Sequence, residues 1–114
     1  MTRKTFLQEF ELFVLLAILR LGPDAYGAAI SRELEETARR TVSIGALYAT
    51  LGRLVDKGYL VQHVSEPLPM KGGRARKHYS LTGSGERAVE HSARTLRRMM
   101  DGIELLERPT GTSG

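Results

Sequence analysis

Apolar residues occupy nearly every position between residues 6 and 21, a pattern that predicts a first helix with no clearly polar side. A helix that is apolar all round must be buried on more than one face. One face can pack in the core of this chain, and the other needs a further partner. The apolar positions are Phe6, Leu7, Phe10, Leu12, Phe13, Val14, Leu15, Leu16, Ala17, Ile18, Leu19 and Leu21.

The next residues predict a turn at 22–24 and a second helix over residues 25–39, with Asp24 as its candidate N-cap. Ile30, Leu34 and Ala38 have the spacing of a buried face. The charged residues of this segment are interpreted as a solvent-exposed face: Arg32, Glu33, Glu35, Glu36 and Arg39. After this helix, residues 41–42 favour a short strand.

A third helix is predicted between Ser43, its candidate N-cap, and Gly58, which ends it. Its apolar residues fall on one side: Ile44, Leu47, Leu51, Leu54 and Val55. The other side carries mainly small residues: Gly45, Ala46, Ala49, Thr50, Gly52 and Arg53. A helix face exposed to solvent usually carries Glu, Lys and Gln, so this composition indicates that the backbone approaches another surface closely.

A β-hairpin follows, because β-prone residues at 59–65 and 78–81 flank a Pro- and Gly-rich loop. The loop is basic and contains no acid between Lys71 and Lys77. Residues 71–79 sum to +4, which equals the net charge of the whole chain. The basic character is therefore a local patch, which favours a polyanionic partner over the alternative of an ordinary solvent-exposed loop.

The last predicted helix runs over residues 83–106, with Thr82 as its cap. A stripe of apolar residues repeats along it as in a coiled coil: Val89, Ala93, Leu96, Met99, Met100, Ile103 and Leu106. Some 23 residues span roughly 35 Å, which is longer than a small domain can cover. Together with the second apolar face of the first helix, this excess predicts a homodimer.

A helix with a small-residue face followed by a basic hairpin matches a winged helix-turn-helix, in which helix and wing both face DNA. The expected fold class is mainly α with a small β-hairpin (α+β). Residues 1–82 would form the DNA-binding domain, residues 83–107 the dimerisation helix and residues 108–114 a disordered tail.

Composition excludes several other classes of protein. The chain has no cysteine, so it has no disulfide, and the absence of a signal peptide pattern predicts a cytoplasmic protein. The apolar run at residues 10–21 is too short to span a bilayer. His63, His78 and His91 are too scattered to predict a metal site. No nucleotide-binding motif or nucleophile–base pair is present, so neither a cofactor nor an enzymatic activity is expected.

Two segments carry a resemblance to a known family. The segments S-I-G-A-L-Y-A-T-L-G-R-L-V-D-K-G-Y-L (43–60) and G-G-R-A-R-K-H-Y-S-L-T-G-S-G (72–85) resemble the PadR family of bacterial transcriptional regulators. The resemblance covers residues 10–100. Three positions depart from the family pattern: Ala28 replaces a common aromatic, Ala75 a common proline and Gly83 a glutamate.

The candidate DNA-binding residues come from the third helix and the wing. Arg53 and Thr50 can bond a base edge or a phosphate, while Ala46 and Ala49 can touch thymine methyl groups. Tyr48 lies at the boundary, where it either reaches a phosphate or only closes the core. Most affinity should come from phosphate contacts and from a wing arginine in a groove. The full set is Ser43, Gly45, Ala46, Tyr48, Ala49, Thr50, Arg53, Lys71, Gly73, Arg74, Arg76 and Lys77.

Dimerisation is expected through the first and last helices, at Phe6, Phe10, Val89, Ala93, Leu96, Met99, Met100, Ile103 and Leu106. The resemblance implies a repressor and a planar apolar effector bound between subunits, with Phe10, Phe13, Leu96, Met99 and Met100 as the candidate pocket. The two methionines are equally compatible with plain core packing. A second hypothesis is an adaptor whose basic wing binds an acidic protein. For a third, an enzyme, no set of residues can be nominated.

Overall fold

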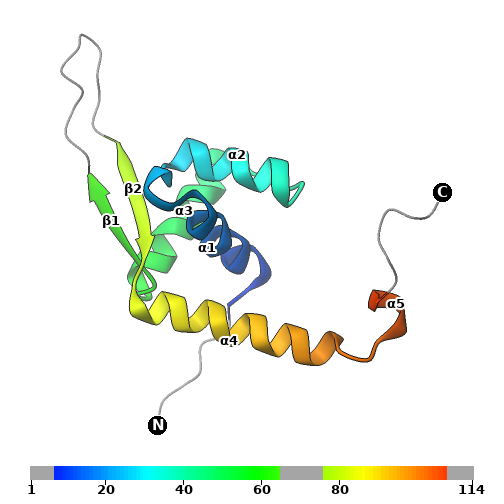
Figure 1. Ribbon diagram of the computed structural model, residues 1–114. Helices are drawn as coiled ribbons and strands as arrows, with labels where there is room; N and C mark the ends of the chain where they lie inside the picture. The colour runs from blue at the N-terminus through cyan, green and yellow to red at the C-terminus, as the bar shows by residue number, and fades with distance from the viewer. Residues whose placement is uncertain (1–6, 65–75, 108–114) are drawn as a thin grey trace.

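The computed structural model describes residues 7–64 and 76–107, in which α1, α2 and α3 pack together beside a two-stranded hairpin and α4 crosses their base (Figure 1). The predictions made for residues 1–6, 65–75 and 108–114 lie outside the described residues. The elements are α1 (Glu9–Leu21), η1 (Gly22–Asp24), α2 (Gly27–Thr37), α3 (Ile44–Asp56), β1 (Leu60–Val64), β2 (Lys77–Leu81), α4 (Gly83–Met100) and α5 (Glu104–Glu107).

Helix α1 is largely buried, as its apolar sequence predicts. It begins at Glu9, where the Glu11 carboxylate accepts a 3.0 Å hydrogen bond from the backbone N–H of Gln8 and so satisfies a free donor at the helix start. Most of its apolar side chains lie in the core, but Leu16 and Leu19 remain 38% and 47% exposed. In a single chain, the second apolar face of α1 is therefore uncovered.

The turn before α2 is confirmed as the short 3-10 helix η1, but the helix itself is shorter than predicted. Its N-cap is Tyr26, so the prediction of Asp24 is wrong. The helix begins later because residues 25–26 join the hairpin: the backbone N–H of Tyr79 donates to the carbonyl of Ala25 at 3.1 Å, and Tyr26 bridges His78. The strand predicted at residues 41–42 is also wrong, since no strand forms there.

Both predicted ends of α3 are confirmed. The Ser43 hydroxyl accepts a 3.1 Å hydrogen bond from the backbone N–H of Ala46, and Gly58 takes φ 81° just after the helix, where residues with a Cβ are strained. The inward face of α3 is built on three leucines that are fully buried: Leu47, Leu51 and Leu54.

Two residues of α3 face the opposite way from the prediction. Ile44 was expected in the core but is 57% exposed, because the first turn of α3 extends beyond the core. Thr50 was expected to face outward but is only 3% exposed. The burial of Thr50 is explained by its position beside Glu11, described below.

The hairpin is antiparallel and in the predicted place. Leu60 pairs with Leu81, and His63 pairs with His78. Leu60 and Tyr79 are buried against the helices, whereas most of β1 is exposed. The hairpin is thus attached to the core at its base.

Thr82 links the hairpin to α4. Its hydroxyl oxygen accepts a 3.0 Å hydrogen bond from the backbone N–H of Gly85, which confirms the predicted cap, and donates to the carbonyl of Gly58 at 2.6 Å. Gly85 lies so close to Tyr59 that a Cβ there would overlap the Tyr59 carbonyl. The start of α4 is therefore fixed against the end of α3.

The prediction of one uninterrupted helix over residues 83–106 is wrong. Helix α4 ends at Met100, Gly102 takes φ 82°, and α5 begins at Glu104. At 1.5 Å per residue, the 18 residues of α4 span about 27 Å rather than 35 Å. In Figure 1, α4 extends away from the body of the protein and α5 lies beyond its far end. The predicted fold class, mainly α with a small hairpin, is confirmed.

Candidate nucleic-acid interface

The exposed face of α3 carries almost no side-chain bulk. Gly45, Ala46, Ala49 and Gly52 are all exposed. A Cβ added at Gly45 or Gly52 would meet no described atom within 4 Å, so packing inside the chain does not require glycine at either position. The bare surface is suited to close approach by an external partner such as the floor of a DNA groove.

Tyr48 packs against α2 and remains partly exposed. Its ring packs over Gly27 at the start of α2, where a Cβ would overlap the Tyr48 hydroxyl. The residue is nevertheless 40% exposed. Tyr48 therefore closes the contact between α2 and α3 and still presents part of its surface to solvent.

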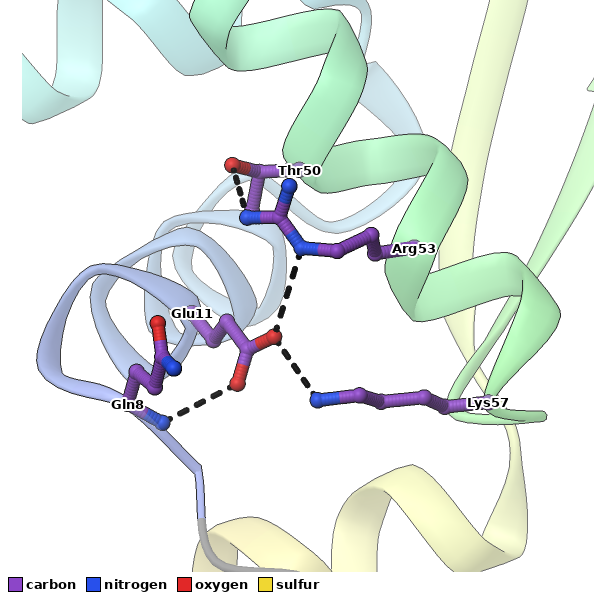
Figure 2. A network of polar contacts seen from close by, with 5 residues as sticks. All are labelled: Gln8, Glu11, Thr50, Arg53 and Lys57. Atoms are coloured by element: carbon purple, nitrogen blue, oxygen red, sulfur yellow. Dashed lines mark hydrogen bonds and ion pairs between the residues drawn. The ribbon is translucent and has the colours of Figure 1, made fainter.

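A polar network joins α3 to α1 (Figure 2). Lys57 Nζ donates to Glu11 Oε2 at 2.8 Å, and Arg53 Nε lies 3.8 Å from the same oxygen. Arg53 Nη2 also donates to Thr50 Oγ1 at 3.0 Å. The side chains of Arg53 and Lys57 are 53% and 32% exposed, whereas that of Glu11 is 2% exposed. Two cations that remain accessible to solvent are thus held by one buried carboxylate.

Glu11 is ionised at neutral pH despite its burial. Burial by itself raises the pKa of this carboxyl group. The hydrogen bonds from Lys57 and from the Gln8 backbone, together with the charges of Lys57 and Arg53, outweigh burial, and the pKa lies below its ordinary value. The network is therefore a charged one under physiological conditions.

The predictions did not include Glu11 or Lys57 in the site. The sequence carried a signal for both: Glu11 interrupts an apolar helix, and a carboxylate in such a place needs a cation. Arg53 and Lys57 lie one turn apart on α3 and supply that charge.

The base of the wing is held by aromatic contacts. The Arg76 guanidinium carbon lies 4.8 Å from the centre of the Tyr26 ring, and His78 meets the same ring edge-on at 4.6 Å. Arg76 and Lys77 are both exposed. The other wing residues of the predicted site, Lys71, Gly73 and Arg74, lie outside the described residues.

The residues predicted for dimerisation divide into two groups. Val89 is only 7% exposed in the single chain, so it belongs to the chain's own core, and Phe10 and Ala93 are half-buried. Phe6 lies outside the described residues, and the other predicted residues are exposed: Leu96, Met99, Met100, Ile103 and Leu106. Together with Leu105, which was not predicted, they form an apolar surface on α4, α5 and the turn between them, which we call the arm.

Two of the hollows that border α1 involve residues discussed above. One of about 350 Å³ lies between α1 and α4 and is lined by Phe13 and Leu96 of the predicted effector pocket, but not by Phe10, Met99 or Met100. The other, of about 570 Å³, lies between α1 and α2 and is lined by apolar residues including Leu16 and Leu19. The Arg20–Glu33 ion pair, with 2.6 Å between Nε and Oε2, lies beside the second hollow.

Other kinds of site are not found in the described part of the chain. No three His, Asp or Glu side chains within residues 7–64 and 76–107 come together as a metal-ligand set. Among the described helices, none has both the length and the hydrophobicity needed to cross a membrane.

Comparison with protein families matches residues 15–91 to the transcriptional regulator PadR-like family. Comparison with curated protein sequences gave no match.

Solved structures share the fold over most of the chain. A PadR-like transcription factor from Bacteroides fragilis is 28% identical, with 85% of this chain and 88% of that one covered and a TM-score of 0.66. A PadR family regulator from Eggerthella lenta is 26% identical, with 89% and 88% covered and a TM-score of 0.64. A PadR-like regulator from Bacillus cereus, 22% identical with 88% and 93% covered, shares the fold at a TM-score of 0.69.

Proposed function

Because the chain belongs to the PadR-like family of transcriptional regulators, and is thus a DNA-binding regulator rather than an enzyme, we propose that it is a repressor that binds a pseudo-palindromic operator as a homodimer. The observation that carries the proposal is the exposed face of α3, which carries small residues and has glycine at positions 45 and 52, where packing against the described residues does not require it. Such a face lets a helix enter the major groove closely.

Helix α3 contacts the bases, and the wing contacts the phosphates. Arg53 is the principal side chain on α3 that can hydrogen-bond a base edge, flanked by Ala46 and Ala49 as apolar contacts. Arg76 and Lys77 at the base of the wing, and Lys71 and Arg74 in its loop, bind phosphates, which supply affinity for any duplex. Thr50 is removed from the proposed contacts because it is buried.

The homodimer forms through α1 and the arm. The arm exposes six apolar side chains, and α1 exposes Leu16 and Leu19. Exposed apolar surface of this extent marks an interaction site. A two-fold dimer presents two α3 helices to one side of the duplex, so the operator has two half-sites about 34–36 Å apart, one helical turn.

A small apolar aromatic compound releases the repressor. The hollow between α1 and α4 supports this role, because it brings Phe13 and Leu96 together beside the proposed dimer surface. A ligand that binds only the folded dimer raises its melting temperature.

Selection from a randomised pool of duplexes tests the function. The wild-type protein should enrich a sequence with two inverted half-sites and bind it far more tightly than a scrambled duplex of the same composition. Equal affinity for all duplexes, or none, would contradict the proposal. Binding to an acidic protein instead would favour an adaptor that uses the basic wing.

A further inference from the structure

We infer that Thr50 and Glu11 are positioning residues for Arg53: they hold one edge of its guanidinium against the protein and leave the other edge to DNA. The inference rests on the proposed function, because it assigns a role in reading a sequence. It adds two buried side chains that cannot themselves touch DNA, at 3% and 2% exposure.

The geometry of the guanidinium separates its two edges. Nη2 donates to Thr50 Oγ1 at 3.0 Å, and Nε lies 3.8 Å from Glu11 Oε2, so the edge formed by Nε and Nη2 faces Thr50 of α3 and Glu11 of α1. The third nitrogen, Nη1, makes no hydrogen bond within the described part of the chain, so Nη1 and the second N–H of Nη2 are left for an external acceptor.

The remaining edge fits the recognition of guanine. Two parallel N–H donors on one edge of an arginine match the O6 and N7 acceptors of guanine in the major groove, or two oxygens of a phosphate. An arginine that is already held loses less side-chain freedom on binding than a free one. Ala46 and Ala49, on the same side of α3, leave room for a base edge to approach Arg53.

The negative charge of Glu11 is neutralised by neighbouring cations, so it does not repel DNA. The carboxylate is balanced by Lys57 Nζ at 2.8 Å as well as by Arg53. Because Lys57 neutralises Glu11, the carboxylate can contact Arg53 without placing an uncompensated negative charge near the phosphates.

The competing role for the network is purely structural, and a matched pair of variants at Thr50 separates the two. Thr50→Val keeps the shape but removes the hydroxyl, whereas Thr50→Ser keeps the hydroxyl. The probe is the duplex that the wild-type full chain enriches from a randomised pool, and the readout is the ratio of its affinity to that of a scrambled duplex. The ratio is measured for both variants, for Arg53→Ala and for Thr50→Val combined with Arg53→Ala, with melting temperatures as the folding control.

If Thr50 positions Arg53, Thr50→Val lowers the ratio about threefold to tenfold per subunit, the worth of one hydrogen bond, and Thr50→Ser keeps it. With Arg53→Ala already present, Thr50→Val changes nothing further. The inference is overturned if Thr50→Val keeps the wild-type affinity ratio. It is also overturned if Thr50→Val lowers the ratio by the same factor in the Arg53→Ala background as in the wild type.

Two further outcomes are distinguishable. If Thr50→Val does not fold, Glu11→Gln replaces it in the same cycle, because glutamine keeps the shape but not the charge. If the wild type enriches no duplex, the proposed function fails and this inference falls with it. If a duplex is enriched but Arg53→Ala binds it unchanged, only the inference fails.

Discussion

Lys57 donates a 2.8 Å hydrogen bond to Glu11 and thereby ties the C-terminal end of α3 to the first turn of α1. The leucines of α3 alone would allow the helix to shift along its apolar contact, whereas a charge-assisted hydrogen bond fixes one position. The same α1 borders the hollow beside α4 through Leu12 and Phe13. A shift of α1 at the proposed effector site would therefore reach the proposed DNA-reading helix directly.

Removing the charge of Lys57 should destabilise the protein. We expect Lys57→Met to lower the free energy of unfolding by about 1–2 kcal/mol, because the buried carboxylate loses its closest hydrogen-bond donor. This is the lower part of the usual range, since the Lys57 side chain is partly exposed and screened by solvent. Lys57→Arg, which keeps a cation, is the control. Urea unfolding measures both, and equal midpoints for Lys57→Met and the wild type would show that the contact contributes nothing.

The lowered pKa of Glu11 predicts a stability that depends on pH. A carboxyl group whose folded pKa lies below its ordinary value of 4.5 stabilises the fold above that value and stops doing so as the pH falls through the folded pKa. The wild type should therefore be more stable than Glu11→Gln at neutral pH, and the difference should shrink below about pH 4.5. Glu33, whose pKa is lowered by its hydrogen bonds to Thr37 and Arg20, is common to both proteins and cancels. A difference in unfolding free energy that stays constant down to pH 3 contradicts this account.

The close approach of Gly85 to Tyr59 predicts that an added methyl group destabilises the protein at Gly85 but not at Gly83. A Cβ at position 85 would overlap a backbone carbonyl, so Gly85→Ala should cost about 1–3 kcal/mol in unfolding free energy. A Cβ at position 83 would meet only the Arg87 side chain at 3.4 Å, and Gly83→Ala should be neutral or stabilising by up to about 1 kcal/mol. Thermal unfolding of the two variants compares them, and the reverse order of stability would rule out the contact.

The arm predicts how dimerisation can be broken without unfolding the chain. Leu96 is 49% exposed in one chain, so Leu96→Glu leaves the protomer core intact but would bury two like charges in the proposed interface. Light scattering should then give the mass of a monomer. Arg94→Glu, which adds an acid at an exposed position two residues away, should remain a dimer. If Leu96→Glu keeps the mass of the wild type and the wild type is a dimer, the interface lies elsewhere.

The sequence predicted those features that depend on a few neighbouring residues. The caps at Ser43 and Thr82 and the turn at Gly58 were found because each requires one residue type at one place. The place of the hairpin followed in the same way, since its two strands are β-prone segments that flank a stretch rich in proline and glycine.

The features that were missed depend on contacts between distant segments. Thr50 is buried because α1 passes beside that flank of α3, which the period of α3 alone does not reveal. Helix α2 starts later than predicted because residues 25–26 pair with β2. The break at Gly102 had a local signal, the Asp101-Gly102 pair, but the apolar stripe outweighed it in the prediction.

The salt dependence of DNA binding tests the central claim, that the wing and α3 together bind a duplex. The measurement compares the slope of log affinity against log salt concentration for the wild type and for Arg76→Ala/Lys77→Ala, using the duplex enriched by the wild type. The slope is negative, and each lost phosphate contact should reduce its magnitude by about 0.9. Two residues in each of two subunits should therefore reduce the magnitude by about 3.6. A double variant with the wild-type slope would contradict the claim.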